Sequence, residues 1–486
     1  MKRTKYRELN LYSYYDHAGI ARHLEDMARQ GWQLEKAGGT FFTYRRCDPA
    51  ELHYAVVYFA KASQFDPEPP AEQREFWELC KATGWELVAS RYQMQIFCNP
   101  AATPTPIETD PVVQVENVRT AMKKGAVRGN WALLICACLQ IWLQFRTYSI
   151  RDFLTQSFAL SAVLIWLLLG INAIVELAAY HLWYRKAKAA AREEGILLSP
   201  HSRRWWQILR IFFVVIITIN LLILYLDPSH SPSTRMVTLV SLFCYTALML
   251  IVYGSRQFMK KRGFSADANM GLTILISIVG AFVLMGGLIW VSFRVADDPS
   301  LRGHVNVETR TSPAYPAGDT KHTYTVYHDP LPLTVEDLVG ETVYKDYSCY
   351  REIHGSPLLT EYTYKQEVPF VFSIPEQDGP DLSCSVYKVH LSCLYKPVKD
   401  SFFRDVQRRN RNSYLISSCD WKAVDAAPWG AQEAYQYVYD GELGGIYLLC
   451  YQDRLVEIRF DPWYNTSPTA EQMALVGEVL GSGPLS

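Results

Sequence analysis

The chain of 486 residues has no overall excess of charge, because 48 Lys and Arg residues stand against 49 Asp and Glu residues and leave a net charge of -1. This balance is an average over three unlike regions: residues 1–110 carry -2, residues 111–293 carry +11 and residues 294–486 carry -10. Nucleic-acid binding depends on Lys and Arg side chains that neutralise phosphates. The acidic last region is therefore not expected to bind nucleic acid, and the basic middle region needs another explanation.

The sequence also lacks the common signatures of catalysis and metal binding. It contains no Gly-x-Ser-x-Gly, no His-Glu-x-x-His and no Gly-rich phosphate-binding loop. Cys384, His390 and Cys393 are near one another in sequence, but their spacing matches no compact ligand pair. We therefore expect no enzymatic activity, and we assign no catalytic residue, no cofactor and no metal site.

Charged residues are scarce in five long apolar stretches in the middle of the chain. A helix needs about 20 mostly apolar residues to cross the hydrocarbon core of a bilayer. We therefore predict a five-helix α transmembrane unit at residues 129–294, in contact with the lipid bilayer, with spans at about 130–148, 153–180, 205–226, 236–253 and 270–293.

The basic residues between these stretches predict how the chain is oriented. Three segments together contain fourteen Lys and Arg residues: the one before the first span, the one between the second and third spans, and the one between the fourth and fifth. The other connections contain four. Lys and Arg near span ends are retained on the cytoplasmic side. The pattern predicts a multi-pass protein of the bacterial inner (cytoplasmic) membrane, with its N-terminus in the cytoplasm and its C-terminus outside.

The region before the membrane unit contains an internal repeat. One copy contains Gln30-Gly31-Trp32-Gln-Leu and the other contains Thr83-Gly84-Trp85-Glu-Leu, each after an amphipathic helical pattern. Gly adopts the left-handed conformation at a helix end at little cost, and the Trp that follows opens a strand. We interpret Gly31, Trp32, Gly84 and Trp85 as a packing motif in which each Trp fills the interface between helix and sheet. Ligand stacking on the Trp rings is the alternative.

Strand patterns at residues 9–15, 32–45, 52–59 and 85–97, with a break at Gly38-Gly39, surround these two helices. The order β-α-β-β-α-β predicts a ferredoxin-like α+β domain at residues 1–105, with one antiparallel sheet. A Pro-rich linker and a juxtamembrane helix follow at residues 106–128.

The motifs of this region resemble the bacterial family called domain of unknown function 2812. The likeness rests on Leu11-Tyr-Ser-Tyr-Tyr, the helix end Met27-Ala-Arg-Gln-Gly-Trp-Gln-Leu, the strand Phe41-Phe-Thr-Tyr-Arg and the second Gly84-Trp85-Glu-Leu, over roughly residues 5–100. The resemblance implies a membrane-associated bacterial protein of the type found beside PadR-type transcriptional regulators. It transfers no catalytic residue to this sequence.

Apart from Arg146 at the end of the first, the predicted spans contain two charged residues, Glu176 and Arg210. Intramembrane charges are rare and often functional. Both lie about one helical turn from the cytoplasmic ends of spans two and three, so we predict a structural pair at similar depth. Snorkelling to the interface and a proton-relay or transport role are the alternatives.

Residues 295–486 show short alternating runs that are typical of strands, together with helical patterns at residues 400–411 and 467–480. We predict an extracytoplasmic β-rich domain of the α+β class, with a mostly antiparallel sheet.

The whole pattern is that of a multidomain membrane protein whose extracytoplasmic domain is coupled to a cytoplasmic domain, with a signalling, regulatory or envelope-related role. A regulatory protein on the cytoplasmic side is the expected partner. The alternative is a transporter or transporter subunit. The oligomeric state does not follow from the sequence.

Overall fold

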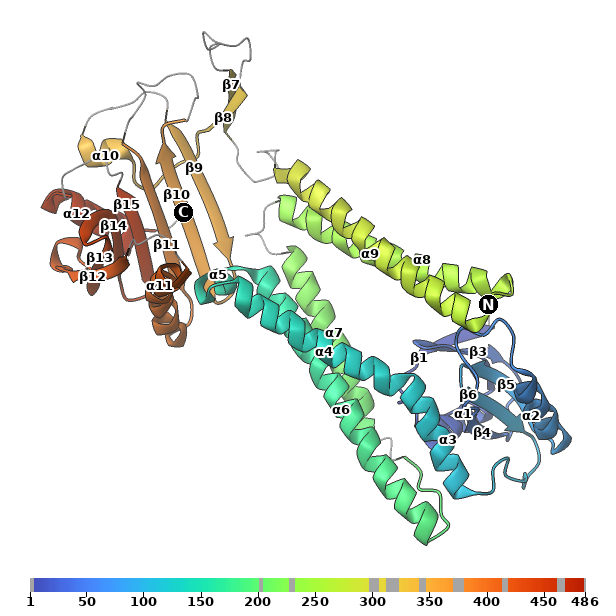
Figure 1. Ribbon diagram of the computed structural model, residues 1–486. Coiled ribbons are helices and arrows are strands. Elements are labelled where there is room, and N and C mark those ends of the chain that lie inside the picture. Colours follow the sequence, from blue (N-terminus) through green and yellow to red (C-terminus); the bar gives the residue numbers. More distant parts are fainter. Residues whose placement is uncertain are drawn as a thin grey trace. The chain divides into compact units, whose positions relative to one another are not determined.

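The computed structural model describes residues 4–200, 204–226, 232–296, 306–311, 323–340, 347–369, 380–412, 418–460 and 468–484 (Figure 1). The chain divides into two compact units. The first contains residues 1–141, 164–220 and 242–286, and the second contains residues 142–163, 221–241 and 287–486. Each unit is described separately.

The N-terminal domain of the first unit is built from two β-α-β-β copies. The first copy consists of β1 (Lys5–Leu9), α1 (His17–Arg29), β2 (Trp32–Ala37) and β3 (Phe41–Arg46). The second consists of β4 (His53–Tyr58), α2 (Ala71–Ala82), β5 (Glu86–Arg91) and β6 (Met94–Asn99). Each copy forms a three-stranded antiparallel sheet, in the orders β1-β3-β2 and β4-β6-β5.

The hydrogen bonding therefore gives two sheets in place of the single antiparallel sheet that we predicted. The segment 32–45, predicted as a strand with a break at Gly38-Gly39, is a hairpin that turns at these two glycines. The segment 85–97, predicted as one strand, is a hairpin that turns at Tyr92, which has a φ of 56°. The first strand is also earlier than predicted, because Asn10 Oδ1 accepts from the Tyr12 amide and begins a loop. The edge strands β2 and β5, which occupy equivalent places in the two copies, lie beside one another.

Local sequence explains where α1 begins and ends. The Asp16 side chain caps the helix by accepting from the Gly19 amide at 3.0 Å. Its apolar face buries Ile20, Leu24 and Met27. The helix ends before Gly31, whose φ of 79° lies in the left-handed region; Gly84 has a φ of 86° after α2, as the repeat predicts.

The core of this domain continues into the helices that follow it. The juxtamembrane helix α3 (Pro111–Lys124) is capped by Asp110 and leads into α4 (Ala126–Thr147). Val115, Val118 and Met122 of α3 belong to the same buried cluster as Ile20 and Leu24. Further members come from the C-terminal part of α6 (Ser157–Glu193), namely Tyr180, Trp183, Ala187 and Ala191.

Four described helical stretches are long and apolar enough to cross a membrane: Pro111–Thr147, Ser157–Glu193, Thr238–Lys261 and Ala266–Val291. The last two lie in α8 (Pro232–Lys261) and α9 (Ala266–Ala296). The predicted span at 205–226 falls on α7 (Arg204–Leu226), whose described apolar stretch, Ile211–Ile223, is shorter. The structure thus supports a membrane-spanning protein, and the fifth span stays a prediction.

The helix that contains the second predicted span begins at Ser157, later than the predicted start at about residue 153. Residues 150–155 form a separate short helix, α5 (Ile150–Thr155), which Ser149 caps. Gln156 has extended backbone angles and separates α5 from α6. Phe153 and Leu154 are apolar because they pack in the core of the C-terminal domain.

The C-terminal domain is built on a seven-stranded sheet with the order β12-β13-β14-β15-β11-β10-β9. Its strands are antiparallel, as the sequence predicted. The strands are β9 (Ser348–Gly355), β10 (Leu359–Glu367), β11 (Leu382–Val389), β12 (Cys419–Val424), β13 (Glu433–Tyr439), β14 (Glu442–Cys450) and β15 (Arg454–Phe460). The strands β7 (Val307–Thr311) and β8 (Thr323–Tyr327) pair antiparallel in a separate two-stranded sheet.

Helices cover both faces of this sheet. One face packs with α11 (Ser392–Asn412) and α5 around Tyr387, Phe402 and Leu455. The other packs with α10 (Val335–Val339), a short 3-10 helix (Ala427–Trp429) and α12 (Ala470–Val476) around Trp429, Tyr447 and Ile458. The helix α12 continues as a π-helical turn at Gly477–Ser482.

Candidate functional site

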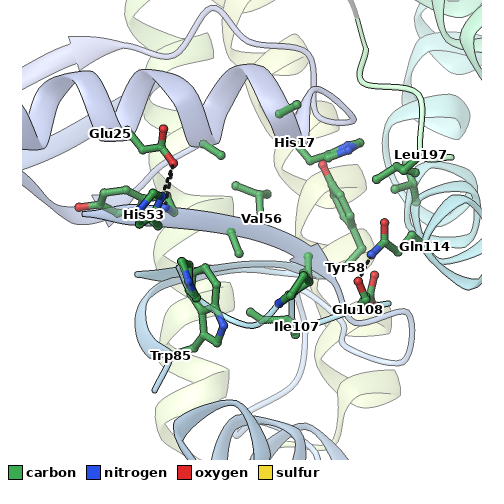
Figure 2. Close-up of a pocket in the computed structure, with 18 residues that line it drawn as sticks. His17, Glu25, His53, Val56, Tyr58, Trp85, Ile107, Glu108, Gln114 and Leu197 are labelled. Atoms are coloured by element: carbon green, nitrogen blue, oxygen red, sulfur yellow. Dashed lines mark hydrogen bonds and ion pairs between the residues drawn. The ribbon is translucent and has the colours of Figure 1, made fainter. Parts of the chain in front are cut away.

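A cavity of about 380 Å³ lies within the first unit, between α1, β4, the Pro-rich linker and α3 (Figure 2). Its walls are mostly apolar, and its polar side chains come from four different segments. The lining residues that matter for its chemistry are His17, Glu25, His53, Tyr54, Tyr58, Trp85, Glu108 and Gln114.

The periodicities of α1 and β4 place several of the lining residues on one wall of the cavity. His17, Ala21 and Glu25 are spaced by four residues on α1, so they occupy one face of the helix. Tyr54, Val56 and Tyr58 alternate on one face of β4 and belong to the main buried cluster. The linker then closes the cavity through Pro104, Pro106 and Ile107.

His17 is the most unusual polar group of the cavity. Its Nδ1 lies 3.2 Å from the carbonyl oxygen of Tyr15, while its buried Nε2 has no hydrogen-bond partner in the described part of the chain. Burial lowers the pKa of His17, so the ring is neutral near pH 7. A neutral ring that donates from Nδ1 leaves Nε2 as an acceptor. Figure 2 shows the His17 ring near Leu197, above Tyr58.

Glu108 brings a carboxyl group to the opposite wall. Burial raises its pKa, although a hydrogen bond from Asn117 Nδ2 at 3.0 Å opposes the shift. The Gln114 side chain donates to the Glu108 carbonyl oxygen and fixes the linker against α3. The linker is thereby held in place on the wall of the cavity.

The remaining polar groups are largely engaged with the protein itself. Glu25 Oε1 lies 3.9 Å from His53 Nδ1 and accepts from the Tyr54 amide at 3.3 Å. Tyr58 donates its hydroxyl to the Tyr14 carbonyl oxygen, and burial raises the Tyr58 pKa well above its ordinary value. These contacts suit a binding cavity for a small, mainly apolar molecule that offers a donor to His17. In the described residues no group of three or more His, Cys, Asp or Glu could hold a metal ion.

The two Trp residues of the repeat have different environments. Trp85 is 4% exposed, lines the cavity and donates from Nε1 to the Thr105 carbonyl oxygen at 2.8 Å. Trp32 is half-buried, with the Arg46 guanidinium 4.9 Å from its ring centre and the Tyr6 ring beside it. Trp85 therefore packs inside the domain, whereas Trp32 packs near its surface.

The structure places Glu176 against the N-terminal domain. The Ser13 hydroxyl lies 3.1 Å and 3.2 Å from the two carboxylate oxygens of Glu176. Arg210 lies on α7, and its side chain is outside the described residues, so the predicted pair stays a prediction. Sequence reasoning missed the cavity and His17, because neither a linker that folds back nor an imidazole at a helix start has a pattern of its own.

Comparison with known proteins addresses the N-terminal region alone. No curated protein and no solved structure matches the chain. A family model does match, and it covers α1 through α3 and the start of α4. The resemblance that the repeat motifs indicated is thereby confirmed: residues 18–127 match the family described as "Protein of unknown function (DUF2812)".

Proposed function

We propose that this chain is a bacterial inner-membrane protein that couples an extracytoplasmic domain to a cytoplasmic domain, in a signalling, regulatory or envelope-related role. The observation that carries the proposal is the continuity of α6, a 37-residue helix with no Pro. Such a helix is about 55 Å long. The start of α6 packs in the second unit and its later part packs in the first. A displacement of the C-terminal domain could therefore be transmitted along one helix to the N-terminal domain.

At its start, α6 is bonded to the C-terminal domain. The Ser157 hydroxyl donates to the Gly355 carbonyl oxygen at 2.8 Å, and the Ser356 hydroxyl donates to the Leu154 carbonyl oxygen just before the helix. Arg151 of α5 lies over the rings of Phe402 and Tyr387, at 4.3 Å and 5.2 Å from their centres. These contacts fasten the beginning of α6 to the β-sheet.

In its second half, α6 is part of the N-terminal core. Tyr15 packs on Tyr180 and Trp183, with ring centres 5.5 Å and 5.3 Å apart. The hydrogen bond from Ser13 to Glu176 adds a polar contact one turn earlier. A rotation or translation of α6 would therefore change the packing next to His17 and the cavity, since the His17 ring also contacts Trp183.

The contacts of each domain agree with the predicted orientation. In the N-terminal domain, the Ala60 carbonyl oxygen accepts a hydrogen bond from Lys124 of α3, and the Gln64 side chain accepts one from Arg256 of α8. Both basic residues lie in segments that the charge pattern assigns to the cytoplasm. The C-terminal domain bonds instead to Arg146 and Leu154, in a connection with few basic residues.

The coupling can be tested by breaking the C-terminal contact and observing the N-terminal domain. In the full chain, Arg151→Gln removes the guanidinium that lies over the Phe402 and Tyr387 rings. We expect faster hydrogen–deuterium exchange in α1 and in residues 176–187 of α6. Lys422→Gln, which removes an exposed charge on β12 of the same domain, is the matched control and should leave that exchange unchanged. A change confined to the C-terminal domain would contradict the proposal.

The orientation can be tested without substitutions. Cys393 is exposed in the C-terminal domain, and Cys47 is partly exposed in the N-terminal domain. A membrane-impermeant maleimide added to intact cells should modify Cys393, and it should modify Cys47 only after permeabilisation. Labelling in the reverse order would contradict the proposed orientation.

The partner proposed on the cytoplasmic side is a regulatory protein of the PadR type. Co-expression of the tagged full chain with the PadR-type regulator from the same genome tests this, and the two should co-purify. Solute uptake by proteoliposomes, with no co-purification, would favour the transporter alternative.

A further inference from the structure

Four arginine residues line a hollow of about 570 Å³ in the second unit. Arg146 comes from the last turn of α4, and Arg404, Arg408 and Arg411 come from α11. Gln407 completes the lining. We call this group the arginine groove.

Helix periodicity and one long-range hydrogen bond form the groove. Residues 404, 408 and 411 are spaced by four and three, so they share one face of α11. Arg408 Nη2 donates to the Arg146 carbonyl oxygen at 3.1 Å. That carbonyl is one of the last in α4, where no amide of the same helix is available. Arg408 thus caps the C-terminal end of α4. The same contact places Arg146 beside the arginines of α11.

In the described part of the chain, the four arginines have only distant compensation: the carboxylate of Asp405 interacts electrostatically with Arg404 and Arg408, but its close ion pair is with Arg151. Among the described residues, no carboxylate lies within 4 Å of the guanidinium groups of Arg146, Arg404, Arg408 or Arg411. The carboxylates of Asp152 and Asp405 instead lie 3.6 Å from Arg151. Bringing like charges together costs free energy that a bound anion offsets. The groove is therefore suited to an anionic ligand.

The neighbouring surface indicates which anion. Just before Arg146, α4 exposes Trp142 and Phe145, which are 58% and 60% exposed. The stretch Pro111–Thr147 is apolar enough to cross a membrane. Acyl chains cover such a surface in a bilayer, and phosphate groups lie where the apolar surface ends. The arginine groove begins at that point of the helix.

We propose that the arginine groove binds the phosphate group of an anionic phospholipid whose acyl chains cover Trp142 and Phe145. Guanidinium groups suit this ligand, because their planar donors match two phosphate oxygens at once. Free phosphate shares the headgroup's chemistry, so the experiment separates the two sources. The bound lipid would tie α4 and α11 together at the point where Arg408 caps α4.

Native mass spectrometry of the purified full chain, titrated with phosphatidylglycerol or phosphatidylcholine, tests the proposal. We expect preferential binding of phosphatidylglycerol. Arg404→Gln/Arg408→Gln should weaken that binding at least about tenfold, since it removes two guanidinium groups that donate charged hydrogen bonds to the phosphate. Lys396→Gln/Lys422→Gln removes the same charge from exposed sites outside the groove and should leave the affinity unchanged. Arg404→Lys/Arg408→Lys, which keeps the charge, should give an intermediate loss.

Three outcomes would overturn the proposal. Equal losses in the two Gln pairs would show that net charge alone attracts the lipid. Equal binding of the two lipids would remove the role of the anionic headgroup. Displacement of phosphatidylglycerol by millimolar inorganic phosphate, with no dependence on acyl chains, would make a soluble anion the ligand. Unchanged circular dichroism and gel-filtration profiles must accompany any loss, and the Lys pair provides a second variant if the Gln pair misfolds.

Discussion

The two β-α-β-β copies share a sequence pattern, but they are used differently. In the first copy, α1 contributes Ile20 and Leu24 to a large core that includes α3 and α6. In the second copy, α2 belongs to a small cluster around Val57, Cys80 and Phe97, and its Leu79 is 65% exposed. The repeat therefore specifies the same local backbone twice, while the linker and the membrane-proximal helices decide which copy becomes the centre of the domain.

The equivalent loops of the two copies reinforce this comparison. In the first, the loop between β1 and α1 contacts α6 through Ser13 and Glu176. In the second, the loop between β4 and α2 contacts α8 and α9, because Gln64 accepts from Arg256 and the Phe65 carbonyl oxygen accepts from Asn269 at 3.1 Å. The two copies thus make hydrogen bonds to different long apolar helices, the first to α6 and the second to α8 and α9.

The largest expected difference between the copies is at the Trp positions. Trp85→Ala should lower the free energy of unfolding of the N-terminal domain by about 3–5 kcal/mol, because it empties a buried site. Trp32→Ala should cost about 1 kcal/mol, since it removes a half-buried ring and a cation–π contact. Hydrogen exchange of the β4 and β6 amides in the full chain measures both. A fragment of residues 1–105 would be unsuitable because it lacks Tyr180 and Trp183. Equal costs would show that the copies are alike after all.

The paired glycines should differ next. Both have positive φ, so an Ala at either costs about 1–2 kcal/mol. A Cβ at Gly31 would also lie 2.9 Å from the Cys47 carbonyl oxygen, which belongs to the backbone, whereas a Cβ at Gly84 would lie 3.2 Å from the Asn99 side-chain nitrogen. Gly31→Ala should therefore be the more destabilising, as measured by the thermal midpoint of the full chain. The opposite ranking would place the greater constraint on the second copy.

For the loop contacts, in contrast to the glycines, we expect the larger loss of stability in the second copy. Asn269 is fully buried and also accepts from Thr273, so Asn269→Ala should cost about 1–3 kcal/mol in the second copy's contact. Ser13→Ala removes a partly buried hydrogen bond and should cost about 0.5–1.5 kcal/mol. Hydrogen exchange in each loop reports the loss locally. If Ser13→Ala were the more damaging, the first copy would carry the main connection to the membrane helices.

The sequence predicted what depends on local physics. The Gly-Trp repeat, the juxtamembrane helix and the antiparallel C-terminal sheet follow from conformational preference and from the periodicity of apolar residues. The sequence indicated the break at Gly38-Gly39 but did not reveal the hairpin at residues 85–97, because it turns at Tyr92, whose positive φ is uncommon for its residue type. It also could not assign Phe153 and Leu154 to the C-terminal core, because apolar residues beside a span look like part of the span. The cavity depends on how the linker folds back, and that depends on tertiary contacts such as Gln114 with Glu108.

The smallest expected effect is a dependence of stability on pH. It distinguishes the two copies, because α1 begins with His17, whereas α2 follows Pro70. Burial lowers the folded-state pKa of His17 below its ordinary 6.5. As the pH falls below 6.5, the unfolded chain takes up a proton before the folded chain does, so this residue makes the domain less stable. Glu108 acts in the opposite sense: burial raises its pKa above 4.5, so stability falls as the pH rises through the interval between 4.5 and that raised value. In thermal scans of the full chain between pH 4.5 and 7, His17→Gln should remove the loss on the acid side, and Glu108→Gln should remove the loss as the pH rises. A pH profile that neither substitution changes would mean that the cavity is open to water, and it would remove the reason for treating His17 as a buried acceptor.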